Sequence, residues 1–198
     1  TLVQCVTYSG HSPFIIPEES KRISFSDKLP ERLRNYMVVA NYTDYAIGQF
    51  ITFLRSQKKF ENTMIVITGD HEGFGLTRKP LYEHALGKDI ISPERFTPLI
   101  VLNSPVHLRY EKVMGQVDLY PTLLDLLGAD DYPWRGLGES ILSSGKKAFA
   151  ISPQMEIIGD TVGVSTAEIQ HAKDAWRVSD LIISCDYFAH GRTGDKKR

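Results

Sequence analysis

Two short runs of apolar residues constrain the fold of this chain more than any other feature. One occupies about residues 63–68 in TMIVITGDH, and the other occupies about residues 96–102 in RFTPLIVLNSP. Both runs are rich in β-branched residues, too short for a helix and apolar at successive positions, which is typical of strands buried on both faces. Such strands form a sheet that helices cover on either side, so the sequence predicts an α/β protein.

Helical patterns lie between and after these runs. Apolar residues recur every three or four positions over roughly residues 30–57, with Ser26 and Asp27 as candidate N-caps. The segment GQVDLYPTLLDLLG predicts a second helix, which Asp118 caps and Gly128 closes.

A third helix is predicted over about residues 166–185, because STAE carries the capping-box pair Ser165 and Glu168. Further strands are predicted over residues 1–8 and 147–159, which contain β-forming residues bounded by turn signals.

Strands and helices thus alternate along the chain. This alternation predicts a three-layer α/β/α fold with a mostly parallel sheet. We expect residues 1–188 to belong to one domain, and residues 189–198 to form a polar tail.

Composition narrows the classes of function. The formal net charge is −1, so no strong positive field favours nucleic acid or an anionic membrane as a partner. The two cysteines, Cys5 and Cys185, lie at opposite ends of the sequence, which fits neither a disulfide framework nor a zinc motif. The first residue is Thr1 rather than Met, and we expect the chain to be part of a longer protein.

Polar residues follow directly after the strand predicted at residues 63–68. Gly69 permits a sharp turn, and Asp70 and His71 then bring a carboxylate and an imidazole to the strand end. Because ligands of open α/β sheets bind beyond the carboxyl ends of the strands, these two side chains are candidate ligands of a divalent cation. The alternative is an aspartate that caps the next turn beside a surface histidine.

Four sequence blocks resemble the alkaline phosphatase superfamily, and within it the sulfatase-like branch that includes lipoteichoic acid synthases and other phosphoglycerol transferases. The blocks are YTDYAIGQF, TMIVITGDH, FTPLIVLNSP and GQVDLYPTLLDLLG, all within about residues 1–140. The resemblance implies an incomplete fold of this type, in which Asp70 and His71 bind one catalytic Mn, Mg, Ca or Zn ion. It also implies that His11, in HSPF, contacts the anionic head of the substrate; an exposed loop histidine is the alternative.

The nucleophile of the family has no counterpart in this sequence. Sulfatases use a Cys or Ser in a Cys/Ser-x-Pro-x-Arg motif, and phosphoglycerol transferases use a Thr; neither Cys5 nor Cys185 has that context. We therefore expect this chain to be the C-terminal part of a catalytic domain and to be inactive alone. Arg78 is a candidate for holding the substrate anion, although solvated loop cations are common.

The function implied by the resemblance is metal-dependent hydrolysis or transfer of phosphate or sulfate esters, with phosphoglycerol transfer preferred. A sulfuric ester hydrolase or a phosphodiesterase using water, or a non-catalytic binding module of the same fold, are the alternatives. The relatives work on the periplasmic or extracellular face of the cell membrane, so we expect the full-length protein to be anchored there by an N-terminal segment. Trp134, in ADDYPWRG, is interpreted as a core or surface aromatic, with a sugar-stacking platform as the alternative.

Overall fold

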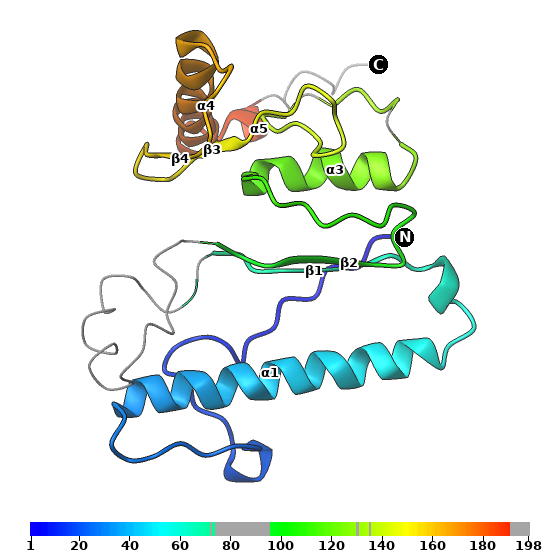
Figure 1. Cartoon of the computed structure of the whole chain (residues 1–198), viewed down its shortest axis with the longest axis vertical. Helices are drawn as coiled ribbons and strands as arrows, with labels where there is room; N and C mark the ends of the chain where they lie inside the picture. The colour runs from blue at the N-terminus through cyan, green and yellow to red at the C-terminus, as the bar shows by residue number, and fades with distance from the viewer. Residues whose placement is uncertain (72, 74–95, 130, 135, 191–198) are drawn as a thin grey trace. The chain divides into compact units, whose positions relative to one another are not determined.

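The computed structural model describes residues 1–71, 73, 96–129, 131–134 and 136–190 (Figure 1). The chain divides into two compact units, Thr1–Ser104 (unit 1) and Pro105–Arg198 (unit 2). Both units contain helices and strands, which confirms the predicted α/β class. Among the described residues, no helix is long and apolar enough to cross a bilayer.

Unit 1 is organised around one long helix. The 3-10 helix η1 (Glu18–Ser20) precedes α1 (Glu31–Arg55), and the 3-10 helix η2 (Phe60–Asn62) leads into strand β1 (Ile65–Thr68) and, later, β2 (Leu99–Leu102). The prediction of α1 from its apolar periodicity is confirmed.

The N-terminal cap of α1 was predicted wrongly. Pro30 occupies the cap position with no side-chain hydrogen bond. Ser26 instead accepts a backbone hydrogen bond from Leu29, and Asp27 pairs with Arg34. A proline suits this position because the first turn of a helix leaves its backbone N–H groups without helical partners.

The core of unit 1 joins the HSPF segment to α1. Phe14 and Ile16 are buried against Val38 and Val39 of α1. Burial of these side chains is the main stabilising term for the segment, at about 1.5–3 kcal/mol for each fully buried residue. The loop that carries His11 is therefore anchored on the helix by the residues that follow it.

The two strands of unit 1 run antiparallel, with Ile65 opposite Leu102 and Thr68 opposite Leu99 (Figure 1). The prediction of a mostly parallel sheet is therefore not met by the described strands. Apolar residues at successive positions indicate burial, but they carry no information about strand direction. The direction depends on the connection between the two strands.

Residues 1–8, predicted as a strand, lie outside both sheets of the described structure. The apolar side chains there are exposed: Leu2, Val3, Val6 and Tyr8. β-Propensity reflects packing against a neighbouring strand, so it does not create a strand by itself.

Unit 2 combines a short helix, a hairpin and a long terminal helix. Its elements are η4 (Gln116–Asp118), α3 (Leu119–Leu126), β3 (Phe149–Ile151), β4 (Ile157–Gly159), α4 (Thr166–Ser184) and α5 (Tyr187–His190). β3 and β4 pair antiparallel, and the Trp176 indole of α4 donates a hydrogen bond to the Ile151 carbonyl at 3.2 Å.

Two predicted helix boundaries in unit 2 are confirmed. Gly128 adopts a φ of 67° just after α3, a conformation that favours glycine. At α4, the Ser165 backbone N–H donates to Glu168 Oε2 at 2.7 Å, and the Glu168 N–H donates to Ser165 Oγ at 3.2 Å. These reciprocal bonds form the capping box expected from STAE.

Asp118 does more than the predicted cap. Its Oδ2 accepts a hydrogen bond from the Gly115 N–H at 2.8 Å, and its Oδ1 accepts one from the Glu139 N–H at 2.9 Å. Lys146 Nζ lies 2.9 Å from Oδ2, and both side chains are buried. Asp118 therefore occupies the N-cap position of α3 as predicted, but its side chain makes no capping hydrogen bond to α3. The carboxylate instead closes the capping box of η4 and joins three parts of unit 2. Nearby, burial raises the pKa of the Tyr110 phenol, and the Asp118 and Glu139 carboxylates raise it further.

Candidate functional site

The end of β1 carries a glycine in a confined place. A Cβ added to Gly69 would lie 3.2 Å from Cγ2 of Thr97, which leads into β2. A larger residue would require the Thr97 side chain to shift by a few tenths of an ångström. Gly69 thus lets the chain leave the sheet beside β2 and then turn outward at Asp70.

Asp70 and His71, the predicted cation ligands, follow each other just after β1, and their side chains lie near one another. Asp70 Oδ2 lies 3.8 Å from His71 Nε2, and the two side chains are 86% and 72% exposed. Two donors that both bind one cation at about 2.1 Å cannot lie more than about 4.2 Å apart, so the observed separation is within reach of a shared ion but close to that upper limit. The donor types, a carboxylate oxygen and an imidazole nitrogen, also fit a divalent metal.

One local contact agrees instead with the capping alternative. The His71 backbone N–H donates to Asp70 Oδ1 at 3.1 Å. This bond engages Oδ1, whereas Oδ2 is the oxygen that lies 3.8 Å from His71 Nε2. The capping interpretation and the cation-site interpretation are therefore compatible. The hydrogen bond from the His71 N–H holds the Asp70 carboxylate beside the His71 side chain.

The pair supplies only part of a coordination sphere. In the parts of the chain that the structure describes, no group of three or more His, Cys, Asp or Glu residues is placed to hold a metal ion. Mn²⁺, Mg²⁺ and Ca²⁺ favour about six or more ligands, mostly oxygen atoms. Further donors would have to come from outside these residues.

His11 lies in a compact turn of its own. Its backbone N–H donates to the Tyr8 carbonyl, and its ring stacks on Tyr8 with centroids 5.8 Å apart. His11 Nδ1 lies 2.7 Å from the Ser12 carbonyl oxygen. Because a carbonyl only accepts, Nδ1 carries the hydrogen, which makes Nε2 the ring atom suited to an external ligand.

Tyr36 of α1 contacts the loops that carry both predicted sites. Its ring meets Phe14, three residues after His11, edge-on with centroids 5.3 Å apart. A Cβ added to Gly73, two residues after His71, would lie 2.7 Å from the Tyr36 hydroxyl oxygen. Tyr36 therefore lies close to both loops.

Sequence reasoning missed Tyr36 because an aromatic residue in an apolar helical stripe indicates packing rather than function. Arg32, one turn earlier on α1, places its guanidinium 5.6 Å from the centre of the Phe14 ring. Their spacing of four residues puts both on one face of α1, but nothing in that spacing marks a functional residue. Arg78, the other predicted anion ligand, lies outside the described residues.

The Sulfatase family model matches residues 1–129, a region that contains His11, α1, β1 and the Asp70–His71 pair. A lipoteichoic acid synthase-like protein of Bacillus subtilis (strain 168), YvgJ, is 32% identical over 155 residues, which are 74% of this chain and 25% of that protein. The lipoteichoic acid synthase of Staphylococcus aureus (strain USA300) is 30% identical over 146 residues, 71% of this chain and 22% of that protein.

The chain therefore spans about a quarter of the length of these curated relatives. The family match covers well over half of the chain and includes all four blocks on which the resemblance was based. The chain belongs to the Sulfatase family, within the alkaline phosphatase superfamily.

Proposed function

We propose that this chain contributes metal-binding and anion-binding groups to a metal-dependent enzyme that cleaves or transfers phosphate or sulfate esters. The observation that carries the proposal is the pairing of Asp70 Oδ2 and His71 Nε2, 3.8 Å apart and exposed at the end of β1. Support also comes from the position of the pair within the region that matches the Sulfatase model. The proposal assigns no nucleophile to this chain.

Asp70 and His71 would hold one divalent cation, with Mn, Mg, Ca and Zn as the candidates. When bound, such a cation neutralises negative charge on the ester group and polarises it toward attack. The Asp70 carboxylate would offset the positive charge of the cation, and the His71 imidazole would bind the cation through Nε2. Gly69 would keep both donors at the strand end, because it allows the tight approach to Thr97.

His11 would bind an anionic oxygen of the substrate or protonate the leaving oxygen. The hydrogen bond to Ser12 fixes the ring and presents Nε2, which donates a hydrogen bond when the imidazole is protonated. Tyr36 would position this loop relative to the one that carries Asp70 and His71. Arg78 remains the second sequence-based candidate for binding the anion.

Phosphoglycerol transfer is the preferred reaction, because the matched relatives are lipoteichoic acid synthase and a protein resembling it. Hydrolysis of a sulfate or phosphate diester by water, or binding without turnover, are the alternatives. We further propose that the complete protein acts on the outer side of the cell membrane and is anchored by a segment that precedes this chain.

Titration of Mn²⁺ into the purified chain tests the metal assignment by calorimetry. We expect Asp70→Asn and His71→Gln each to weaken Mn²⁺ binding by at least about tenfold, because each removes a direct donor. Asp44→Asn on α1 and His107→Gln are matched controls, since both residues are exposed and lie outside the proposed site. Equal Mn²⁺ affinity in the site variants and the controls would contradict the assignment.

A further inference from the structure

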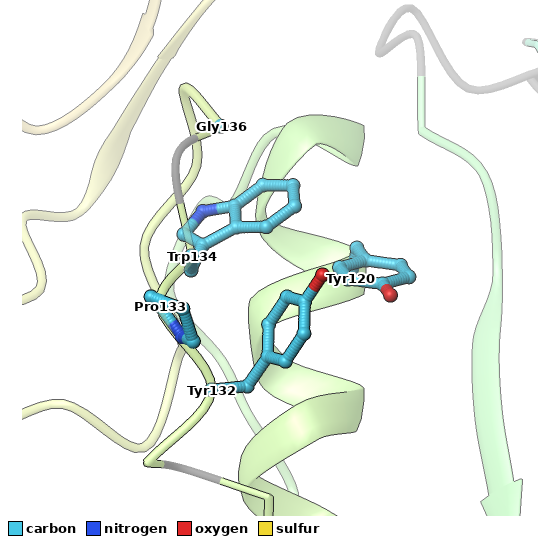
Figure 2. A pocket seen from close by; sticks show the side chains of 5 residues that line it. All are labelled: Tyr120, Tyr132, Pro133, Trp134 and Gly136. Atoms are coloured by element: carbon cyan, nitrogen blue, oxygen red, sulfur yellow. The ribbon is translucent and has the colours of Figure 1, made fainter. Parts of the chain in front are cut away.

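An aromatic groove of about 370 Å³ lies beside the first turn of α3, entirely within unit 2 (Figure 2). Its lining consists of Tyr120, Tyr132, Pro133, Trp134 and Gly136. The volume falls within the range of small-molecule pockets, roughly 300–1,000 Å³. None of these residues has a role in the ester chemistry proposed above.

The indole of Trp134 is held in a fixed orientation. Its Nε1 donates a hydrogen bond to the Gly138 carbonyl at 3.0 Å, and its ring stacks on Tyr120 with centroids 5.0 Å apart and planes 29° apart. A Cβ added to Gly136 would lie 1.8 Å from Trp134 Cζ2, so the backbone contacts the indole closely only because this residue is glycine. A ligand would therefore meet rings that are already ordered, which lowers the entropic cost of binding.

The three rings nevertheless keep much of their surface open. Tyr120 is 49% exposed, Tyr132 is 55% exposed and Trp134 is 39% exposed. Figure 2 shows Tyr132 and Trp134, from the loop after α3, on the same side of the helix as Tyr120. The groove thus offers flat apolar faces together with phenol hydroxyl groups at its edge.

This chemistry suits an uncharged, polyhydroxylated occupant. The lining residues that the structure describes are aromatic or small and carry no charge. Aromatic faces pack against the C–H face of a sugar ring, and phenol hydroxyl groups donate to and accept from sugar hydroxyl groups. We propose that Tyr120, Tyr132 and Trp134 form a binding site for a neutral pyranose sugar.

Tryptophan fluorescence gives a direct test that does not depend on enzymatic activity. The sequence contains only two tryptophans, so Trp176→Phe leaves Trp134 as the sole reporter. Trp176 is a suitable residue to replace because it does not line the groove. Its indole donates a hydrogen bond that joins α4 to β3. The probes are methyl β-D-glucopyranoside, cellobiose and, as a competitor class, tetramethylammonium chloride.

We expect saturable changes in Trp134 emission with the two sugars and weaker binding of tetramethylammonium. In the same background, Tyr120→Leu should weaken sugar binding by about tenfold, because it removes one stacking face while keeping an apolar side chain. Tyr187→Leu, which alters an exposed tyrosine of α5, is the matched control and should leave the affinity unchanged. Circular dichroism should confirm that each variant retains the helical content of its parent.

Three results would overturn the proposal. They are the absence of a saturable response to either sugar, tetramethylammonium binding as tightly as the sugars, and equal sugar affinity in the Tyr120→Leu and Tyr187→Leu proteins. The second result would assign the rings to a quaternary ammonium ligand through cation–π contacts.

Discussion

We propose separate chemical tasks for His11 and the Asp70–His71 pair, although both lie in unit 1. The imidazole of His71 shares its site with a carboxylate 3.8 Å away, whereas His11 is hydrogen-bonded to a backbone carbonyl and stacked on Tyr8. A carboxylate beside an imidazole favours the binding of a cation. The imidazole of His11, which contacts a backbone carbonyl and the Tyr8 ring, is better suited to binding an anion. The two histidines should therefore respond to different ligands.

This difference predicts the behaviour of His11→Ala. We expect binding of glycerol 1-phosphate to the Mg²⁺-loaded chain to weaken by about tenfold, because a hydrogen bond to a charged oxygen is lost. Mg²⁺ affinity should remain unchanged. Phosphorus NMR titration measures the first quantity and calorimetry the second, with His107→Ala as the control. A parallel loss of metal affinity would show that His11 acts on the cation instead.

Tyr36 leads to a second prediction for single residues. Tyr36→Phe keeps the edge-on contact with Phe14, whereas Tyr36→Ala removes it. We expect Tyr36→Ala to lower the free energy of unfolding by about 3–5 kcal/mol when the neighbouring side chains do not fill the cavity left by the ring. Tyr36→Phe should lower the free energy of unfolding much less. Chemical denaturation measures both. Glycerol 1-phosphate affinity that falls in Tyr36→Phe without a loss of stability would identify a positioning role for the hydroxyl.

The sequence was sufficient to place Asp70 and His71 just after the end of a strand, because their adjacency and the strand end are local features; their role as metal ligands stays a prediction. It could not reveal Tyr36 as a shared contact. That role depends on Phe14 and Gly73, which meet α1 only after the chain has folded. Nothing in the helical periodicity distinguishes such a tyrosine from an ordinary core residue.

At the scale of elements, the capping box of α4 gives a pH-dependent prediction. Hydrogen bonds from the Ser165 backbone, and then from its side chain, hold the pKa of Glu168 below its usual value of 4.5. A lowered pKa means that the ionised form stabilises the folded state. This contribution is present above the unfolded pKa and is lost as the pH falls through the lowered value.

We therefore expect Glu168→Gln to remove part of the loss of thermal stability that occurs on acidification below about pH 4.5. Glu156→Gln is the matched control, because Glu156 is also exposed. Thermal unfolding followed by circular dichroism measures the effect. Identical pH profiles for the wild type and Glu168→Gln would contradict the stabilising role of the ionised carboxylate.

Helices were predicted better than sheets, for a physical reason. The stripe of α1 and the Ser165–Glu168 box depend on residues three or four positions apart, so they are visible in a short window of sequence. The antiparallel pairing of β1 with β2 depends on residues far apart in the chain. The exposed segment 1–8 illustrates the same limit, because its strand propensity has no effect without a paired neighbour.

For the whole molecule, the boundary between the two units and the boundary of the family match do not coincide. The match ends at residue 129, inside unit 2, whereas the units divide after Ser104. Asp118 lies before the end of the match, but its partners Glu139 and Lys146 lie beyond it. Residues outside the family match therefore help to stabilise α3, which lies within it.

This arrangement predicts a localised effect of breaking the buried ion pair. Lys146→Met should lower the free energy of unfolding of unit 2 by about 3–5 kcal/mol, because it leaves the Asp118 carboxylate buried without its cation. Hydrogen exchange measured by mass spectrometry should show lost protection within residues 105–198 and little change within residues 1–71. Lys173→Met, on α4, is the control. A uniform loss of protection in both units would contradict this localisation.

The pairing of Thr68 with Leu99 has a consequence for how such a protein can diversify. The chain leaves the β1–β2 pair and re-enters it at neighbouring points, so the intervening segment can change length without altering the strands. Each doubling of a flexible insertion adds only about 0.6 kcal/mol of closure entropy. Evolution can therefore vary the length of the chain between residues 73 and 97 while β1 and β2 keep their pairing and Asp70 and His71 stay at the end of β1.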